Sequence, residues 1–484
     1  MTVMNNYSRP QRWMFGAIVL VALALHVGLF IAFKPWDPVV AHERVVVSDA
    51  RGYHDLALKL LHTRSFDDFG AFRTPAYPLF VAAIYAVVGA KPWVVLLVQI
   101  FISVGTGILV SAIAHRVTGS LQSAFITLVL AALNPLFPVM ALQLMSETLF
   151  TFILAAALLV CIMAFEMRQS RRFAIAGVLL GLTALVRPVS WYLPWVVAPF
   201  ILLQPKNART NNVKHTFIFL GVFFLTLFPW QVRNYRTYRA YALATVADYN
   251  LLEYNAARVK SIIEEVSLDQ AREELNQSVA STEHNPFARA RAQKRAALSY
   301  IAQHPVTYAW YHIKGGVNMF VGTVKGELLI MAGRAPAHSA SSVTAERLSE
   351  RVARVVFNLK HEFYLTPLLL FQLLIEYTGF VVGAIALFVK KKGWLAAFFL
   401  SIVLYFFLTV GLVGSSRFRH PVMTAYFPVS AYGLWIIVRQ IYMRLCRGKP
   451  RTPLGLTPFR TRSNGAHAHG VDQHLPSGLI TIHL

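Results

Sequence analysis

The stretch VVVSDARGYHDLALKLL, residues 45–61, places five polar side chains within seven positions: Asp49, Arg51, Tyr53, His54 and Asp55. Charged side chains this close to a long apolar run are costly in lipid and tend to serve a function. An aspartate can accept a proton from a hydroxyl group, while a neighbouring guanidinium holds an anionic group. The stretch is therefore a candidate for base chemistry on an anionic substrate.

Further charged residues stand at turns of the chain that are expected to lie on the same side of a membrane. They are Arg73 in RTPAYP, Glu147 in LMSETLF, Arg187 in LVRPVSWY, Arg233 in PWQVRNY, and Arg417 and Arg419 in SSRFRHP. A single arginine at such a place would be explained by snorkelling or by pairing. Convergence from five turns instead indicates a site in which a carboxylate activates a nucleophile and arginines hold a phosphate leaving group.

Asp49 also has a purely structural interpretation. Apolar residues repeat at helical spacing after it, which predicts an amphipathic helix on the membrane surface, preceded by an extended stretch. At the start of that helix Asp49 could cap free backbone N–H groups, which contributes about 1 kcal/mol, and do nothing more. The periodicity does not decide between the capping role and the chemical one.

The elements that must position these residues lie in lipid. The chain has 484 residues, of which 56% are hydrophobic and 14% are charged. A soluble domain could not bury so much apolar side chain, and several runs reach the roughly 18–20 residues that cross hydrocarbon. The sequence therefore predicts an all-α, polytopic membrane protein with about 10–13 transmembrane helices.

Spans are predicted near residues 14–33, 93–114, 120–138, 143–165, 173–189, 190–204, 215–230, 363–389, 394–412 and 422–438. The segment 76–90 is short, and we expect an interfacial or re-entrant helix rather than a span. The segment 306–332 carries Lys314, Lys325 and Glu327 among several glycines. We expect it to be a poor lipid-facing helix and to stay outside the membrane.

Basic clusters set the orientation. They occur at 9–12, 168–172, 206–214, 390–392 and 444–451, and all fall on one side in this arrangement. By the positive-inside rule that side is the cytoplasm, so both termini are cytoplasmic and residues 34–92, 231–362 and 413–421 lie outside. The same rule accounts for much of the net charge of +24, with attraction to anionic lipids as a second contribution, and nucleic acid is not the expected partner.

Four parts follow from this threading of the chain. Residues 1–230 form an N-terminal transmembrane catalytic module that includes the first outer loop, 34–92. Residues 231–362 form a large outer region, 363–438 the C-terminal transmembrane helices, and 439–484 a cytoplasmic tail without hydrophobic periodicity, expected to be disordered.

Several stretches resemble the membrane glycosyltransferases of the GT-C superfamily. These are SDARGYHDLALKLL with FRTPAYPLFVAAIYAVVG, NPLFPVMALQLMSETLFTFIL, GLTALVRP, PWQVRNY and SSRFRHP. Their order and spacing are most similar to the bacterial protein-mannosyltransferase-like branch, relatives of the lipid A aminoarabinose transferase. The resemblance covers residues 1–240, and more loosely 360–440.

The resemblance implies an inverting enzyme at the outer face of the inner membrane. It would transfer a hexosyl or pentosyl group from a polyprenyl-phosphate-linked donor to a lipid, glycan or protein acceptor. Asp49 matches the family's essential acid, the general base, with Asp55 as second acid and Tyr53 as aromatic neighbour. The donor phosphate would be held by arginines that match best at Arg417 and Arg419, and less closely at Arg187 and Arg233.

The remaining candidates for substrate binding are Arg51, Arg73 and Glu147. A divalent metal is possible, with His54 and Glu147 as conceivable ligands, although capping and pairing explain both residues as well. Two other functions remain open. A secondary transporter also places charges near the membrane, but it favours internal repeats and broken helices, which this sequence lacks. A non-catalytic protein that binds or flips a lipid carrier would need the arginines but not Asp49.

Overall fold

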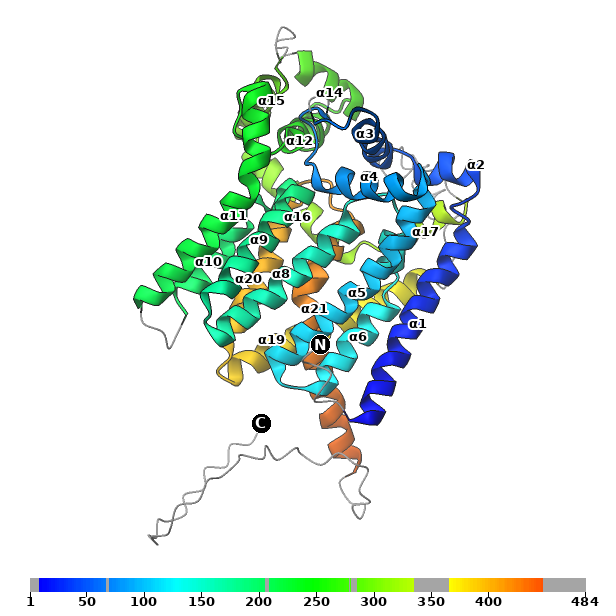
Figure 1. Ribbon diagram of the computed structural model, residues 1–484, viewed down its shortest axis with the longest axis vertical. Helices are drawn as coiled ribbons and strands as arrows, with labels where there is room; N and C mark the ends of the chain where they lie inside the picture. Colours follow the sequence, from blue (N-terminus) through cyan, green and yellow to red (C-terminus); the bar gives the residue numbers. More distant parts are fainter. Residues whose placement is uncertain are drawn as a thin grey trace. The chain divides into compact units, whose positions relative to one another are not determined.

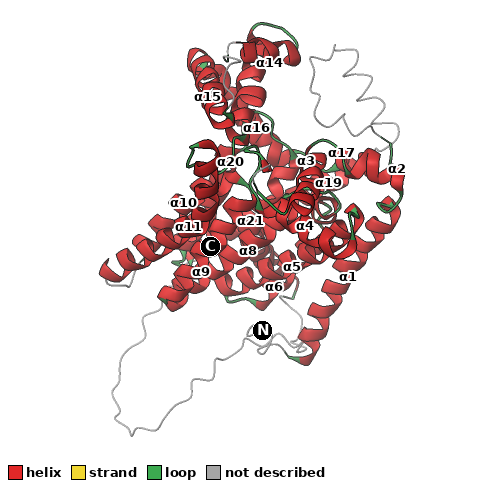
Figure 2. Cartoon of the chain, turned by 45° about the horizontal axis from the view of Figure 1, so that its top comes forward, coloured by secondary structure: helices red, strands yellow, loops and turns green. Residues whose placement is uncertain are grey.

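The computed structural model describes residues 8–66, 69–204, 209–277, 279, 285–334 and 365–446, and these form helices and turns without any strand (Figure 1, Figure 2). The all-α prediction is confirmed for this part of the chain. Six of its helices are long and apolar enough to cross a membrane: α1 (Arg9–Phe33), α5 (Pro92–Thr118), α8 (Glu147–Met167), α11 (Arg209–Tyr238), α19 (Leu365–Val389) and α21 (Arg419–Leu445).

The chain divides into two units, Met1–Arg439 and Gln440–Leu484. Every element that bears on function belongs to the first unit. The second begins within the last turns of α21, and the tail predicted to be disordered lies outside the described residues from position 447 onward.

Shorter helices complete the bundle: α4 (Ala76–Val88), α6 (Leu121–Leu133), α7 (Leu136–Ala141), α9 (Ser170–Val186), η4 (Pro188–Tyr192), α10 (Leu193–Leu202) and α20 (Gly393–Thr409). The span predicted at 120–138 is therefore two helices. Helix α6 ends because Asn134 precedes Pro135, and a residue before proline is driven out of the helical region. Helix α11, in contrast, is longer than predicted and continues past residue 230 to Tyr238.

Small residues bring α9 and α11 into close contact. A Cβ atom on Gly177 would lie 2.5 Å from the carbonyl oxygen of Phe219, so only glycine fits there. Close approach at glycine is a common way for helices to associate in lipid, where apolar burial gives little driving force. This contact fixes the direction of α9 and with it the position of Arg187, which follows the last residue of that helix.

The first loop folds as helices that lie crosswise to the bundle. They are α2 (Pro38–Val40), η2 (Ala41–Val45) and α3 (Asp49–Thr63), followed by α4, which Figure 1 shows running across the long helices. Helix α4 has 13 residues, which is about 20 Å and shorter than the roughly 30 Å of hydrocarbon. Its length supports the prediction that 76–90 does not span the membrane.

The extended stretch predicted before Asp49 is wrong. Asp37 accepts the backbone N–H of Val39 at 2.8 Å and so caps α2, and the helix then continues as a π-helix to Val45. Three successive valines favour a strand only where a partner strand exists, and here the local helix start prevails. The chain then reverses at Ser48, whose φ of 50° makes the turn into α3.

Residues 246–303 form a small helical subdomain, apart from 278 and 280–284, which are not described. Its helices are α12 (Val246–Asn250), η5 (Leu251–Ala256), α13 (Ala257–Ile263), α14 (Leu268–Gln277) and α15 (Pro286–Gln303). They enclose a core of their own, built around Leu252, Ala271 and Ala297. The backbone N–H of Thr245 donates to the carbonyl of Ala71 at 2.9 Å and joins this subdomain to the first loop.

Helix α16 (Pro305–Val321) is not among the described helices that are apolar enough to cross a membrane, in agreement with the sequence expectation. Its exposed large apolar side chains are Val306, Trp310, Ile313, Val317 and Val321, and Lys314 and Asn318 are exposed as well. The buried Gly315 faces residues 411–414, and the ammonium of Lys314 lies 5.0 Å from the ring centre of Trp310. Helix α16 therefore exposes both apolar and polar side chains.

Candidate active site

Two carboxylates and three guanidinium groups meet at one end of the bundle, and we call them the ion-pair cluster: Asp49, Arg73, Glu147, Arg187 and Arg417. Each belongs to a different element. They come from the first turn of α3, the turn before α4, the first turn of α8, the end of α9, and η7 (Ser416–Phe418). The sequence expectation that these turns converge is met for these five residues.

Asp49 is paired on both oxygens. Its Oδ1 accepts from Nη2 of Arg73 at 3.0 Å, and its Oδ2 lies 3.6 Å from Nη2 of Arg417. Burial by itself would raise the pKa of Asp49, but the charges of Arg417 and Arg73 outweigh it and hold that pKa below its usual value. The carboxylate is therefore ionised at neutral pH, and its side chain remains 43% exposed, so a substrate can reach it.

The capping interpretation fits less well. The N-cap position of α3 is Ser48, whose side chain makes no capping hydrogen bond, and Asp49 is the first residue inside the helix. Its carboxylate faces two arginines from other elements. A negative charge in the first turn of a helix interacts favourably with the helix dipole, but this interaction does not require two guanidinium partners.

Glu147 and Arg187 form the buried part of the cluster. Oε1 of Glu147 lies 2.6 Å from Nη1 of Arg187, and the Glu147 side chain is only 2% exposed. Arg187 also donates to Oγ of Ser146 at 3.2 Å. Nε of Arg417 lies 3.7 Å from Oε1 of Glu147, so Arg417 bridges the two acids. A buried carboxylate needs such partners, because an uncompensated charge there is strongly destabilising.

Tyr53 packs against Arg73 of the ion-pair cluster. The guanidinium carbon of Arg73 lies 4.1 Å from the ring centre of Tyr53, whose hydroxyl is 3.1 Å from Oγ of Ser146. Gly52 gives Arg73 its room, since a Cβ atom there would lie 3.1 Å from the guanidinium. Tyr53, predicted to bind substrate, is buried and orients Arg73; Gly52 and Ser146 are contributors that the sequence analysis missed.

Arg51 and Asp55 lie outside the cluster. Both are exposed on α3. At about 100° per residue, Tyr53 falls within about 40° of Asp49 on the helix, whereas Arg51 and Asp55 are separated from it by about 160° and about 120°. These two predicted substrate-binding residues therefore face away from the carboxylate of Asp49.

Arg233 lies outside the cluster as well. It donates to the carbonyl oxygens of Gly70, at 3.0 Å, and Phe66, and its guanidinium carbon lies 4.9 Å from the ring centre of Trp230. These contacts hold the end of the first loop against α11. Its observed role is to position the loop that carries Arg73.

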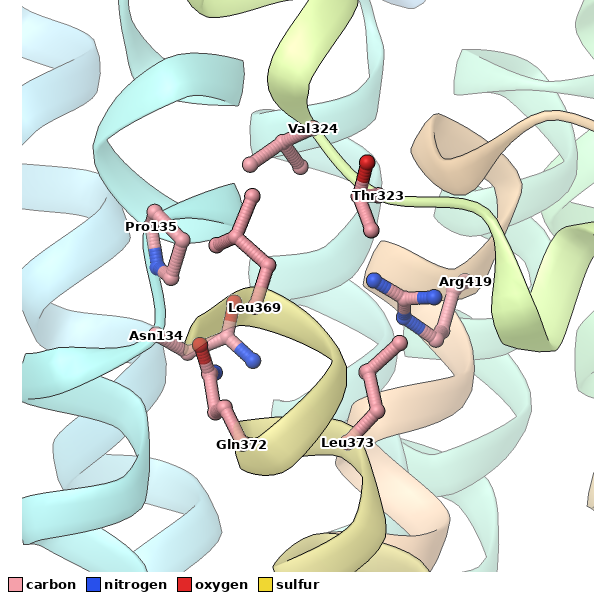
Figure 3. Close-up of a pocket in the computed structure, with 8 residues that line it drawn as sticks. All are labelled: Asn134, Pro135, Thr323, Val324, Leu369, Gln372, Leu373 and Arg419. Carbon is pink, nitrogen blue, oxygen red and sulfur yellow. The ribbon is translucent and has the colours of Figure 1, made fainter. Parts of the chain in front are cut away.

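Arg419 is separated from Arg417 by one residue but points elsewhere. It is 3% exposed, and its Nη1 donates to the carbonyl oxygens of Phe320 at 2.7 Å and Gly322 at 2.8 Å, at the end of α16. It lines a small pocket together with Thr323 and Gln372 (Figure 3). No residue that lines this pocket belongs to the ion-pair cluster. Arg419 thus holds the end of α16.

Glu327 is a third acid near the cluster, on α17 (Lys325–Met331). Its Oε1 accepts from Oγ of Ser416 at 3.2 Å, directly before Arg417. Burial raises the pKa of Glu327, and the charges of Arg417 and Arg419 offset this only in part. The sequence carries no pattern that links Glu327 to SSRFRHP, because the two are brought together only by the packing of α16.

The described residues do not assemble a metal site. Among them, no three His, Cys, Asp or Glu side chains lie close enough to hold one ion. Nδ1 of His54 is 2.9 Å from the hydroxyl of Tyr85, and Glu147 is paired with Arg187. Both predicted ligands are thus engaged with protein groups, and guanidinium groups supply the positive charge beside the two carboxylates.

Comparison with known proteins finds one matching family and several solved structures with a similar fold. Residues 73–232 match the family described as dolichyl-phosphate-mannose-protein mannosyltransferase. Among solved structures, the chain is similar to the oligosaccharyltransferase AglB of the archaeon Archaeoglobus fulgidus in complex with an inhibitory peptide and a dolichol-phosphate. The two are 16% identical with a TM-score of 0.52, over 92% of this chain and 53% of that one.

A second structure of an Archaeoglobus fulgidus oligosaccharyltransferase, in complex with Zn and sulfate, gives 16% identity and a TM-score of 0.51, over 89% of this chain and 50% of that one. ArnT from Cupriavidus metallidurans bound to undecaprenyl phosphate gives 14% identity over 93% and 82% of the two chains, with a TM-score of 0.35, too low to establish a shared fold. No curated protein sequence matches the chain. The chain spans about half the length of the oligosaccharyltransferases it resembles.

Proposed function

Because this chain has the fold of the GT-C membrane glycosyltransferases, we propose that it transfers a sugar from a polyprenyl-phosphate-linked donor to an acceptor hydroxyl at the outer face of the membrane. The observation that carries the proposal is the ion-pair cluster, in which an accessible aspartate stands between two arginines. The matched family and the AglB structure both name a dolichol-phosphate compound, which supports this class of donor.

The charge of the cluster suits a phosphate. Three guanidinium groups and two carboxylates leave one positive charge in excess. Arg417 is the best placed to bind the donor, since its side chain is 30% exposed and its pairs with Asp49 and Glu147 are both longer than 3.5 Å. The guanidinium group of Arg417 can form two hydrogen bonds to a phosphate while Glu147 and Arg187 remain paired.

Asp49 acts as the general base in this mechanism. The acceptor oxygen attacks the anomeric carbon, the bond between that carbon and the phosphate oxygen breaks, and its electron pair leaves with the phosphate. The hydroxyl proton goes to an oxygen of Asp49. One displacement without a covalent intermediate inverts the anomeric configuration. When the donor phosphate draws Arg417 away, the pKa of Asp49 rises toward its usual value and the carboxylate becomes a better base.

The position of the cluster favours this function over the transporter. Transporter sites lie near the middle of the bilayer between repeated helices, whereas this cluster stands at the starts and ends of helices α3, α8 and α9. A non-catalytic lipid-carrier binder would keep the arginines but has no need of an exposed carboxylate between them. The requirement for Asp49 therefore separates binding from catalysis.

The donor arginine gives a direct test. Arg417→Ala should raise the donor KM by about 30- to 1000-fold, from the loss of about 2–4 kcal/mol of charge-assisted hydrogen bonding, and Arg417→Lys should recover only part of it. Arg419→Lys is the matched control. It keeps the positive charge at this position but loses hydrogen bonds to the end of α16, so it should lower the stability of the protein and leave the donor KM nearly unchanged. Unchanged donor kinetics for Arg417→Ala in purified protein would remove this residue from the site.

The orientation is tested by labelling. In a Cys446→Ser background, which removes the exposed natural cysteine, a cysteine at Asp269 should react with an impermeant reagent added to intact spheroplasts. A cysteine at Arg209 should react only after the membrane is opened, because it lies within a basic cluster predicted to be cytoplasmic. The reverse pattern would place the cluster on the cytoplasmic face and contradict the proposed location at the inner membrane's outer surface.

A further inference from the structure

Three aromatic side chains form a row that leads away from the ion-pair cluster, and we call Phe72, Tyr249 and Tyr254 the aromatic track. The ring centres of Phe72 and Tyr249 are 5.3 Å apart at 81°, and those of Tyr249 and Tyr254 are 6.4 Å apart at 73°. Phe72 and Tyr254 are both more than a third exposed. The track therefore presents ring surface to solvent rather than to a protein core.

The track begins at the cluster itself. The guanidinium carbon of Arg73 lies 5.5 Å from the ring centre of Phe72, and the same arginine bonds Asp49. The charge of Asp49 also reaches Tyr249, where it adds to burial and to Glu253 in raising the pKa of the phenol. A ligand lying on Phe72 and Tyr249 would thus have its end beside the proposed base.

Hydrogen bonds hold Tyr249 in this place. The chain between α11 and α12 is tied down at Leu243, whose carbonyl accepts from Nε1 of Trp230 at 2.8 Å, and at Thr245, whose N–H donates to Ala71. Ala71 immediately precedes Phe72. The backbone hydrogen bond between Thr245 and Ala71 therefore joins the two sides of the track independently of its three rings.

Planar polar groups stand at the far end of the track. The guanidinium carbon of Arg272 lies 5.1 Å from the ring centre of Tyr254, and its Nε donates to the carbonyl of Glu253 at 3.1 Å. The carboxylate of Glu253 in turn accepts from Nδ2 of Asn276 at 2.6 Å. Charged and amide groups beside an aromatic ring can bond hydroxyl groups at the rim of a ligand whose face lies on the ring.

This combination matches a sugar ring. A pyranose has C–H bonds on its faces, which are attracted to the negative face of an aromatic ring, and hydroxyl groups at its edge, which bond planar polar side chains. An acyl chain would gain nothing from the partly exposed Arg272 and Asn276. A peptide would need paired backbone partners, and the exposed groups here are side chains.

We infer that the aromatic track binds sugar rings of the acceptor, so that the acceptor is a glycan or glycolipid and its terminal hydroxyl is delivered to Asp49. The inference rests on the proposed function, and it selects one of the acceptor classes left open by the sequence. Tyr249 and Tyr254 are substrate-binding residues in this account and take no part in the bond-breaking step.

The test separates acceptor binding from donor use. The full chain in nanodiscs is exposed to methyl glycosides of short oligosaccharides, and binding is followed by saturation-transfer NMR. Tyr249→Ala and Tyr254→Ala should each weaken binding about 2- to 10-fold, consistent with the loss of one ring contact. Tyr249→Phe should bind as wild type, because it keeps the ring. Tyr241→Ala is the matched control, an exposed tyrosine stacked on Tyr235, and should have no effect.

Donor hydrolysis by water, measured with polyprenyl-phosphate hexoses and pentoses, is followed in parallel with the wild-type protein and should be unchanged in Tyr241→Ala. The inference is overturned if no oligosaccharide binds, if the alanine variants bind as wild type, or if serine- and threonine-containing peptides bind through the same residues. If the wild-type protein consumes none of the donors while oligosaccharide binding depends on the track, the proposed function fails and the sugar site stands.

Discussion

Replacing Asp49 with asparagine will remove most sugar transfer, by about 10²–10⁴-fold, while the protein inserts and folds normally and still binds its donor. Asparagine keeps the size of the side chain, and its oxygen can still accept from Arg73, but it has no basic carboxylate to take the acceptor proton. Donor binding survives because the phosphate contacts come from Arg417 on another element. The readout is transfer rate together with donor affinity and thermal stability.

Asp55→Asn is the matched control for this experiment. Asp55 is a carboxylate on the same helix, exposed and turned away from the cluster, so its loss should leave the transfer rate near that of wild type. The capping interpretation of Asp49 predicts near-normal turnover and only a small loss of thermal stability, because asparagine caps a helix about as well as aspartate does. An Asp49→Asn protein that transfers sugar at the wild-type rate would leave capping as the only role of the residue.

The largest stability effect is expected at Arg187. Arg187→Gln leaves Glu147, which is 2% exposed, as a buried charge without its closest partner, at a cost of about 3–5 kcal/mol. The double variant Glu147→Gln/Arg187→Gln removes that charge and should regain part of the loss. Thermal unfolding in detergent, followed by size-exclusion recovery, measures both variants.

Arg116→Gln, which breaks the ion pair between Arg116 and Glu166, is the control for this prediction. Arg116 and Glu166 lie 2.7 Å apart, a distance close to that of Glu147 and Arg187, but Glu166 is 39% exposed. Breaking that pair should cost about 0–1 kcal/mol. If Arg187→Gln were as mild as Arg116→Gln, or if the double variant were less stable than the single one, the buried pair would not hold the site together.

The members of the ion-pair cluster could be picked out from the sequence because charged side chains beside membrane-spanning segments are energetically costly and therefore rare. Asp49, Glu147 and Arg187 each stand at the end of an apolar run, where charge is expensive, and the positive-inside rule places those ends on one face. The all-α architecture follows from the same physics, since a spanning segment must satisfy its backbone internally.

The direction of each side chain could not be predicted. Arg417 and Arg419 share one motif, but they stand two residues apart in a continuous helical stretch, η7 followed directly by α21, so their side chains leave it in different directions. Arg233 likewise carries the expected residue type at the expected turn and bonds loop carbonyls instead. A motif specifies a residue and an approximate place, while its partner is set by packing.

Contacts between distant segments were missed for the same reason. Glu327 reaches Ser416 only because α16 packs closely on residues 411–414, where glycines face one another. Tyr249 reaches Phe72 only through the ties from Trp230 and Thr245. None of these pairs has a spacing along the sequence that periodicity could detect.

The central claim is that the cluster cleaves a polyprenyl-phosphate sugar with Asp49 as base. It is tested most directly by ³¹P NMR of purified protein mixed with polyprenyl-phosphate hexoses and pentoses and an extract of envelope glycans. We predict that the phosphodiester signal of one donor is replaced by that of a polyprenyl phosphate monoester with the wild-type protein and not with Asp49→Asn. Release of the monoester at equal rates by both proteins, or by neither with any donor, would contradict it.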